Sequence, residues 1–120
     1  MKFDIDCVRD ILLAVESVEF NKTISLGELS KVLTDYTADE ITYNCLKLYE
    51  ANYLHVVTKR VGSATIVVRI VDITYEGHQF LANIREATVW DQVKKKCHAI
   101  GSFSIPVIQE VASSLLKSFI

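Results

Sequence analysis

Six side chains in this sequence are of the kinds that bind metals or act as nucleophiles. They are Cys7, Cys45, Cys97, His55, His78 and His98. No two of them have the C-x2-C or H-x3-H spacing that brings two ligands onto one ion, and three widely spaced cysteines are not a disulfide framework. Cys45 and Cys97 fall on apolar stripes, as buried free cysteines commonly do. We therefore expect structural cysteines and histidines, no metal and no cofactor.

Acidic residues are numerous, but their positions fit helix starts better than acid–base catalysis. Asp4 and Asp6 precede and begin one apolar stripe, and Asp39 and Glu40 begin another. The positive end of a helix favours carboxylates at such places. The chain contains no GxxxxGK[ST], GxGxxG or GxSxG motif. The sequence therefore predicts a protein that is not an enzyme.

The period of the apolar residues predicts the elements that position these side chains. Capping boxes at Ser25–Glu28 and Thr37–Glu40 open the second and third of three N-terminal helices. From Leu54 the period changes to that of strands, with a turn at Gly62, which predicts a β-hairpin. Further helices should start at Thr74, at Thr88 with Asp91 as its cap, and at Ser104. The predicted ranges are 4–18, 25–33, 37–52, 54–71 for the hairpin, 74–84, 88–100 and 104–119.

Three helices, a hairpin and a fourth helix, with a tight linker before the third, are the order of a winged helix-turn-helix unit. The predicted fold is thus α+β, mainly α, with a winged-helix domain over residues 1–85. Residues 86–120 should form a C-terminal two-helix extension that packs on this domain or forms a dimer surface. At 120 residues the chain is long enough to bury a core without disulfides.

Four segments carry a resemblance to a known family: residues 1–6, 41–54, 73–81 and 84–90. The most specific parts are Thr-Tyr-Glu-Gly-His-Gln-Phe-Leu at 74–81 and Thr-Val-Trp at 88–90. Over nearly its whole length the chain resembles a family of short proteins of unknown function that is found largely in bacteria and their prophages. The resemblance implies a winged-helix fold and a mobile-element setting, with no assigned activity and no catalytic residues.

Charge is unevenly distributed. Fifteen acids against thirteen bases give a net charge of −2, which excludes a uniformly basic nucleic-acid binder. Residues 1–50 hold ten acids and five bases, whereas residues 51–71 hold Lys59, Arg60 and Arg69 and no acid. The sequence shows neither a signal-peptide core nor an apolar run of about 20 residues, the length that a bilayer requires. We expect a cytoplasmic protein with no membrane contact.

The outer face of the third helix is the first candidate for a binding surface. With Ile41, Cys45 and Leu48 inward, the helix should present two acids, an aromatic residue and a leucine, which fits a protein contact better than a phosphate contact. Leu46 could instead pack on another part of the chain. The protein-binding candidates are Asp39, Tyr43, Leu46 and Glu50.

A DNA-binding regulator is the alternative, with the third helix in a major groove and the hairpin on the backbone. Its candidate residues are Thr42, Tyr43, Lys47, Lys59 and Arg60. The run Lys94–Lys96 is either a solvated surface or a phosphate clamp, because consecutive residues point to different helix faces.

The last helix carries a long apolar stripe that either packs on the preceding helix or pairs two chains. The dimer candidates on it are Ile108, Val111, Leu115 and Phe119. The sequence as a whole predicts a non-enzymatic, phage-type winged-helix protein that binds a protein of the host or of a competing element, with a homodimer possible.

Overall fold

The computed structural model describes residues 1–118 and shows a mixed α+β chain that is mainly helical. The chain divides into two compact units, residues 1–78 and the residues from Gln79 onward. The division falls inside the fourth helix, ahead of the predicted boundary near residue 85. The elements are α1 (Ile5–Glu16), β1 (Ile24–Ser25), α2 (Leu26–Val32), α3 (Ala38–Glu50), β2 (Leu54–Val61), β3 (Ala64–Ile73), α4 (Tyr75–Ile84), α5 (Ala87–Ile100) and α6 (Ile105–Lys117).

The starts of the first three helices are fixed by local hydrogen bonds, as predicted. The Asp4 carboxylate accepts bonds from the amides of Asp6 and Cys7 at 3.0 and 3.2 Å. At Ser25 and at Thr37 both bonds of the capping box are present. Each box pairs two amides that the first turn of a helix leaves without an intrahelical partner.

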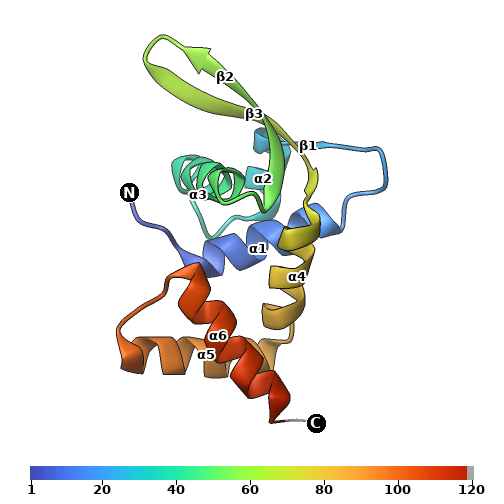
Figure 1. Cartoon of the computed structure of the whole chain (residues 1–120). Helices are drawn as coiled ribbons and strands as arrows, with labels where there is room; N and C mark the ends of the chain where they lie inside the picture. The colour runs from blue at the N-terminus through green and yellow to red at the C-terminus, as the bar shows by residue number, and fades with distance from the viewer. Residues whose placement is uncertain (119–120) are drawn as a thin grey trace. The chain divides into compact units, whose positions relative to one another are not determined.

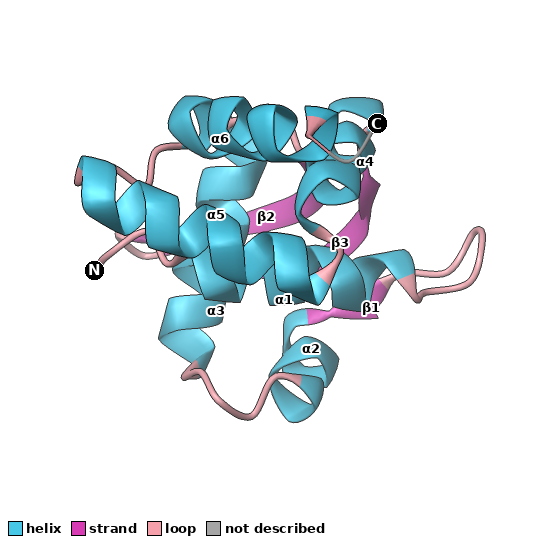
Figure 2. Ribbon diagram, turned by 90° about the horizontal axis from the view of Figure 1, so that it is seen from below, coloured by secondary structure: helices cyan, strands magenta, loops and turns pink. Residues whose placement is uncertain are grey.

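The sheet of the first unit is antiparallel, with the order β1-β3-β2. Its strand β1 was not predicted, because two residues show no periodicity. Ile24 pairs with Ile70 and Ser25 with Arg69, so β1 lies along β3 just before α2 begins (Figure 2). Beyond β1 the hairpin of β2 and β3 continues as two strands and reaches past α2 and α3 (Figure 1).

Two β-bulges shape β3. Two register shifts of one residue each leave Val71 and Val68 without a partner on β2. At a bulge, two residues of one strand oppose one residue of the other. The buried residues of β3, Val67, Ile70 and Ile73, therefore recur at every third position. The strict alternation that the sequence predicts is wrong for β3 because of these two insertions.

The core of the first unit lies between α1, α3 and the base of the sheet. One face of each helix is fully or almost fully buried, with apolar side chains at the spacing that the sequence predicts. These side chains are Val8, Ile11, Leu12 and Val15 of α1, Ile41, Cys45 and Leu48 of α3, and Leu54 and Ile70 of the sheet.

The first turn of α4 lies directly against the backbone that leads into β2. The Thr74 hydroxyl donates to the Asn52 carbonyl at 2.7 Å and accepts from the Gly77 amide at 3.0 Å, which confirms Thr74 as the helix cap. A Cβ on Gly77 would collide with the carbonyl oxygen of Tyr53 and lie 2.6 Å from Cγ2 of Ile73. Only glycine leaves room for this approach.

In the second unit, α5 begins two residues earlier than the predicted cap at Thr88 implies. Its cap is Glu86, whose carboxylate accepts from the Val89 amide at 2.9 Å. Thr88 thus lies inside the first turn, and the predicted cap by Thr88 with Asp91 is wrong. Gly101 ends α5 in the left-handed conformation, with φ of 86°, and Ser104 caps α6 as expected. The buried residues of this helix pair are Val89, Trp90, Val93, Cys97, Ile108, Val111 and Ala112.

Candidate interaction surfaces

The outer face of α3 carries the four protein-binding candidates at different depths. Asp39 and Glu50 are exposed, whereas Tyr43 and Leu46 are half-buried. Leu46 is therefore neither a core residue nor a fully solvated one. The face that sequence spacing places inward is buried, with Ile41, Cys45 and Leu48 inaccessible to solvent.

Lys47 is tied to its neighbours on this face. Its Nζ lies 2.9 Å from Oε2 of Glu50 and 5.3 Å from the ring centroid of Tyr43. The hydrogen bond that Lys47 donates to Glu50 raises the pKa of the lysine. The spacing i, i+4 and i, i+3 brings Tyr43, Lys47 and Glu50 into one row along the helix. The only lysine of the outer face is thus already paired with a carboxylate.

Thr42 lies on the flank of the same face and is half-buried. Its hydroxyl donates to the Ala38 carbonyl at 2.8 Å, which is the back-bond that threonine commonly makes within a helix. The Thr42 hydroxyl therefore already donates its hydrogen bond within α3.

Among the exposed aromatic residues that the sequence did not identify are Tyr49 and Phe20. Tyr49 of α3 is 46% exposed, although it lies next to the buried Leu48. Phe20, in the segment between α1 and β1, is 89% exposed and lines a hollow of about 410 Å³ together with Val71 and His78. Phe20 follows no periodic stripe, so no sequence pattern pointed to it.

The hairpin separates its two basic candidates. Lys59 pairs with Ile66 and Arg60 with Thr65, and no register shift lies between these pairs. Consecutive residues of a strand point to opposite faces. Arg60, which donates to the Thr65 hydroxyl at 3.3 Å, shares the face of the buried Val67, while Lys59 lies on the opposite face. A ligand that covers one face of the hairpin meets only one of the two charges.

The three lysines of α5 do not act as one cluster. Lys94 lies with Nζ 5.8 Å from the ring centroid of Trp90 and is half-buried, whereas Lys95 and Lys96 are exposed. Their separation follows from the 100° that successive helix residues turn, so the run offers no single phosphate-binding surface.

The dimer candidates of α6 fall on two sides of the helix. Ile108 is fully buried, so it is not part of a dimer surface. Val111 is nearly buried and Leu115 half-buried, and both line a groove on the accessible side. Phe119 lies outside the described residues.

The cysteines are buried and not assembled into a site. All three side chains are inaccessible to solvent, and burial raises the pKa of both Cys7 and Cys45 to about 12. Within residues 1–118 no three His, Cys, Asp or Glu side chains gather as metal ligands would. Over the same residues no helix is both long and apolar enough to span a bilayer.

A buried amide that sequence spacing did not identify joins α3 to the start of α1. Asn44 is fully buried; its Oδ1 accepts from the Asp4 amide at 2.9 Å, and its Nδ2 donates to the Glu40 carbonyl at 2.8 Å. Because its partner Asp4 is forty residues away, no local pattern could reveal this role.

Comparison with known proteins places the chain in a family. The family model described as "Hypothetical protein (DUF2513)" matches residues 2–104, and the chain belongs to this family. A curated protein of Haemophilus influenzae, described as an uncharacterized protein, is 24% identical over 122 residues, which cover 100% of this chain and 99% of that protein. No solved structure matches the chain.

Proposed function

We propose that this member of the DUF2513 family is a non-enzymatic winged-helix protein of the cytoplasm that binds another protein through the outer face of α3. The order α1-β1-α2-α3-β2-β3, with a sheet of order β1-β3-β2, supports the winged-helix assignment. The resemblance to prophage proteins suggests the setting, in which the partner belongs to the host or to a competing element.

The row formed by Tyr43, Lys47 and Glu50 carries this proposal. Binding of DNA draws most of its nonspecific affinity from the neutralisation of phosphates by free cations. On α3 the cation is held by Glu50 at 2.9 Å, and Asp39 adds a second exposed carboxylate. The half-buried Tyr43 is instead of the residue type that is enriched in protein-binding hot spots, and the half-buried Leu46 adds apolar surface beside it.

A DNA-binding regulator is the second candidate, favoured by the charge of the hairpin. Residues 51–71 carry three bases and no acid, and Lys59 and Arg60 are both exposed. Their placement on opposite faces suits a strand pair that enters a groove between two phosphate backbones better than one that lies flat on the duplex. In this alternative the affinity comes from the hairpin, since α3 contributes a paired lysine.

The two functions can be distinguished by which variants abolish binding and by how strongly binding depends on salt concentration. For the protein contact, proteins captured from a lysate of the source bacterium are compared between the wild type, Leu46→Asp and Val32→Asp. Val32 is a matched control because it is an exposed apolar residue of the neighbouring α2. We expect an identified partner that is retained at moderate salt and by Val32→Asp, and lost with Leu46→Asp.

The DNA arm uses fluorescence anisotropy with mixed duplex DNA at low and at moderate salt. Steeply salt-dependent binding that is lost when Lys59 and Arg60 are both changed to Ala would overturn the protein-binding proposal. Circular dichroism shows whether Leu46→Asp is folded. Should it unfold, the pair Asp39→Lys and Glu50→Lys tests the same face at exposed positions.

A further inference from the structure

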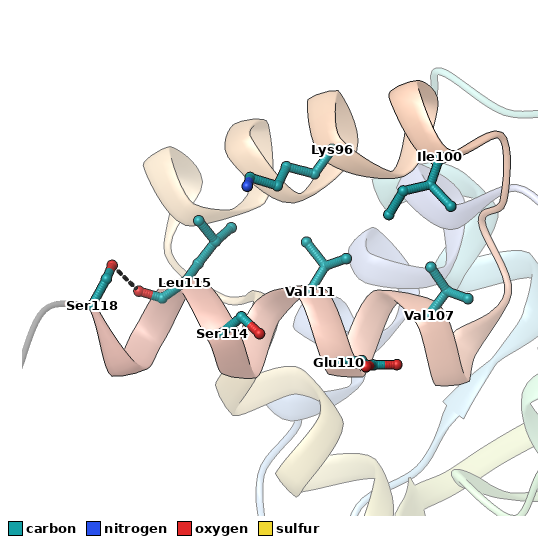
Figure 3. Close-up of a pocket in the computed structure, with 8 residues that line it drawn as sticks. All are labelled: Lys96, Ile100, Val107, Glu110, Val111, Ser114, Leu115 and Ser118. Atoms are coloured by element: carbon teal, nitrogen blue, oxygen red, sulfur yellow. Dashed lines mark hydrogen bonds between the residues drawn. The ribbon is translucent and has the colours of Figure 1, made fainter.

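A groove runs between α5 and α6 on the accessible side of this helix pair. Its volume is about 540 Å³, and every residue that lines it belongs to the second unit. Figure 3 shows Ile100 of α5 and three residues of α6, Val107, Val111 and Leu115, that point toward the space between the two helices. These four side chains make the groove apolar along most of its length.

The groove leaves large apolar side chains in contact with water. Ile100 is 61% exposed, and Val107 and Leu115 are half-buried. Each square ångström of such surface that a partner covers contributes roughly 25 cal/mol to association. Covering the groove with a partner would therefore favour association, because these apolar side chains are in water in the single chain.

The two rims of the groove carry opposite charges. Lys96 lies on the α5 rim and Glu110 on the α6 rim, and both are exposed (Figure 3). Neither has an ion-pair partner within residues 1–118. A surface with one cation on one rim and one anion on the other is complementary to itself under a two-fold rotation that exchanges the rims.

We propose that a second copy of this chain covers the groove in a two-fold symmetric homodimer. The α5 rim of each copy lies along the α6 rim of the other, so that each Lys96 faces the Glu110 of the opposite copy. The apolar residues of the two grooves, with Ile100 as the most exposed, meet between these two ion pairs. This proposal is independent of the α3 surface, which belongs to the first unit.

The size of the helix pair sets the expected strength of the dimer. Helices of 14 and 13 residues are each about 20 Å long, and side by side they offer a face of about 400 Å². Standard interfaces cover about 800 Å² on each partner. The dimer should therefore be weak and visible only at high protein concentration.

Charge reversal in trans tests the pairing directly. In the Lys96→Glu variant a homodimer would oppose the new carboxylate to Glu110, and in the Glu110→Lys variant it would oppose two lysines, so each variant alone should dimerise at least tenfold more weakly. A one-to-one mixture of the two variants can form a heterodimer in which both contacts are attractive. At one contact the new carboxylate at position 96 faces the new ammonium at position 110, and at the other the native Glu110 faces the native Lys96, so mixing should restore the affinity. Restoration is also expected from the double variant Lys96→Glu with Glu110→Lys, whose homodimer opposes a carboxylate to an ammonium at both contacts.

Sedimentation equilibrium over a wide concentration range measures the dimer, with Lys95→Glu as a control for net charge. Lys95 is exposed but does not line the groove, so this variant should dimerise as the wild type does. Ile100→Glu should abolish the dimer without unfolding the chain, because Ile100 is exposed. A wild type that stays monomeric at every concentration, or a double variant that dimerises no better than the single variants, would overturn the proposal.

Discussion

In the first unit, directional polar bonds between residues far apart in the sequence supplement an apolar core. In the second unit, the buried residues of α5 and α6 are all apolar. Asn44 bonds the start of α1, and the Tyr36 hydroxyl donates to Asp10 at 2.7 Å. The Thr74 hydroxyl donates to the Asn52 carbonyl, just after α3. In the helix pair the contact is made by residues such as Val93, Cys97 and Ile108.

The difference explains which surface each unit leaves available. A hydrogen bond fixes two groups to within a few tenths of an ångström, and a buried polar group that loses its partner is costly. Apolar packing is not directional, so two helices can satisfy their inner stripe and still leave a groove on one side. The first unit therefore presents a shaped α3 face, and the second presents an unfilled apolar groove.

The largest effect should come from the closest approach in the first unit. Gly77→Ala places a methyl group against the Tyr53 carbonyl and Cγ2 of Ile73, and backbone cannot move aside cheaply. We expect a loss of about 3 kcal/mol in the free energy of unfolding, measured by chemical denaturation.

Gly27→Ala in α2 is the matched control for this change. The nearest atom to its new Cβ, the Ser25 hydroxyl oxygen, is 3.9 Å away. Removal of a glycine from a helix should here raise the free energy of unfolding by up to about 1 kcal/mol. Equal effects of the two alanines would show that Gly77 is not packed as described.

The next effect should come from the bonds of Asn44. Asn44→Ala removes the acceptor of the Asp4 amide and the donor to the Glu40 carbonyl, and it leaves a space in the core. The free energy of unfolding should fall by about 1–3 kcal/mol. Asn83→Ala, at a half-buried position of α4, is the control and should change it little. A loss below about 0.5 kcal/mol for Asn44→Ala would mean that directional bonds do not hold α1 on α3.

Local features of the chain could be predicted from the sequence, and long-range ones could not. The caps at Asp4, Ser25 and Thr37 are bonds over two or three residues, so the pattern that makes them is visible in the sequence. The bond between Asn44 and Asp4 joins residues forty positions apart, so no such pattern exists for it.

Irregular parts of the sheet could not be predicted from the sequence either, and the same applies to the depth of candidate surface residues. A two-residue β1 has no period, and the bulges at Val68 and Val71 depend on pairing with β2 rather than on residue type. For the same reason spacing could place Leu46 outward on α3 but could not determine how deeply it lies. The depth of a side chain depends on what covers it, and that is a property of the whole fold.

The smallest effect is expected from labelling the buried cysteines of the unmodified chain, which compares how readily each unit opens. Burial raises the pKa of all three thiols, to about 12 for Cys7 and Cys45, so at about pH 8 the reactive thiolate is scarce in the folded protein and labelling requires opening. Cys97 lies in the groove-bearing helix pair, whose apolar contacts should open at lower cost. Mass spectrometry of samples labelled with iodoacetamide should therefore show Cys97 modified first, and Cys7 and Cys45 later and together.

The same thiols predict how the stability of the first unit depends on pH. The ordinary thiol pKa of 9.0 applies to the unfolded chain, and the folded value for Cys7 and Cys45 is about 12. Between these values the unfolded state holds fewer protons than the folded state, so the free energy of unfolding falls as pH rises from about 9 toward about 12, and the contribution is fully present below about 9. Labelling of Cys7 and Cys45 should accordingly accelerate above about pH 9 by more than the increase in thiolate alone. If Cys7 or Cys45 reacts before Cys97 at about pH 8, the polar bonds of the first unit do not make it the more resistant of the two.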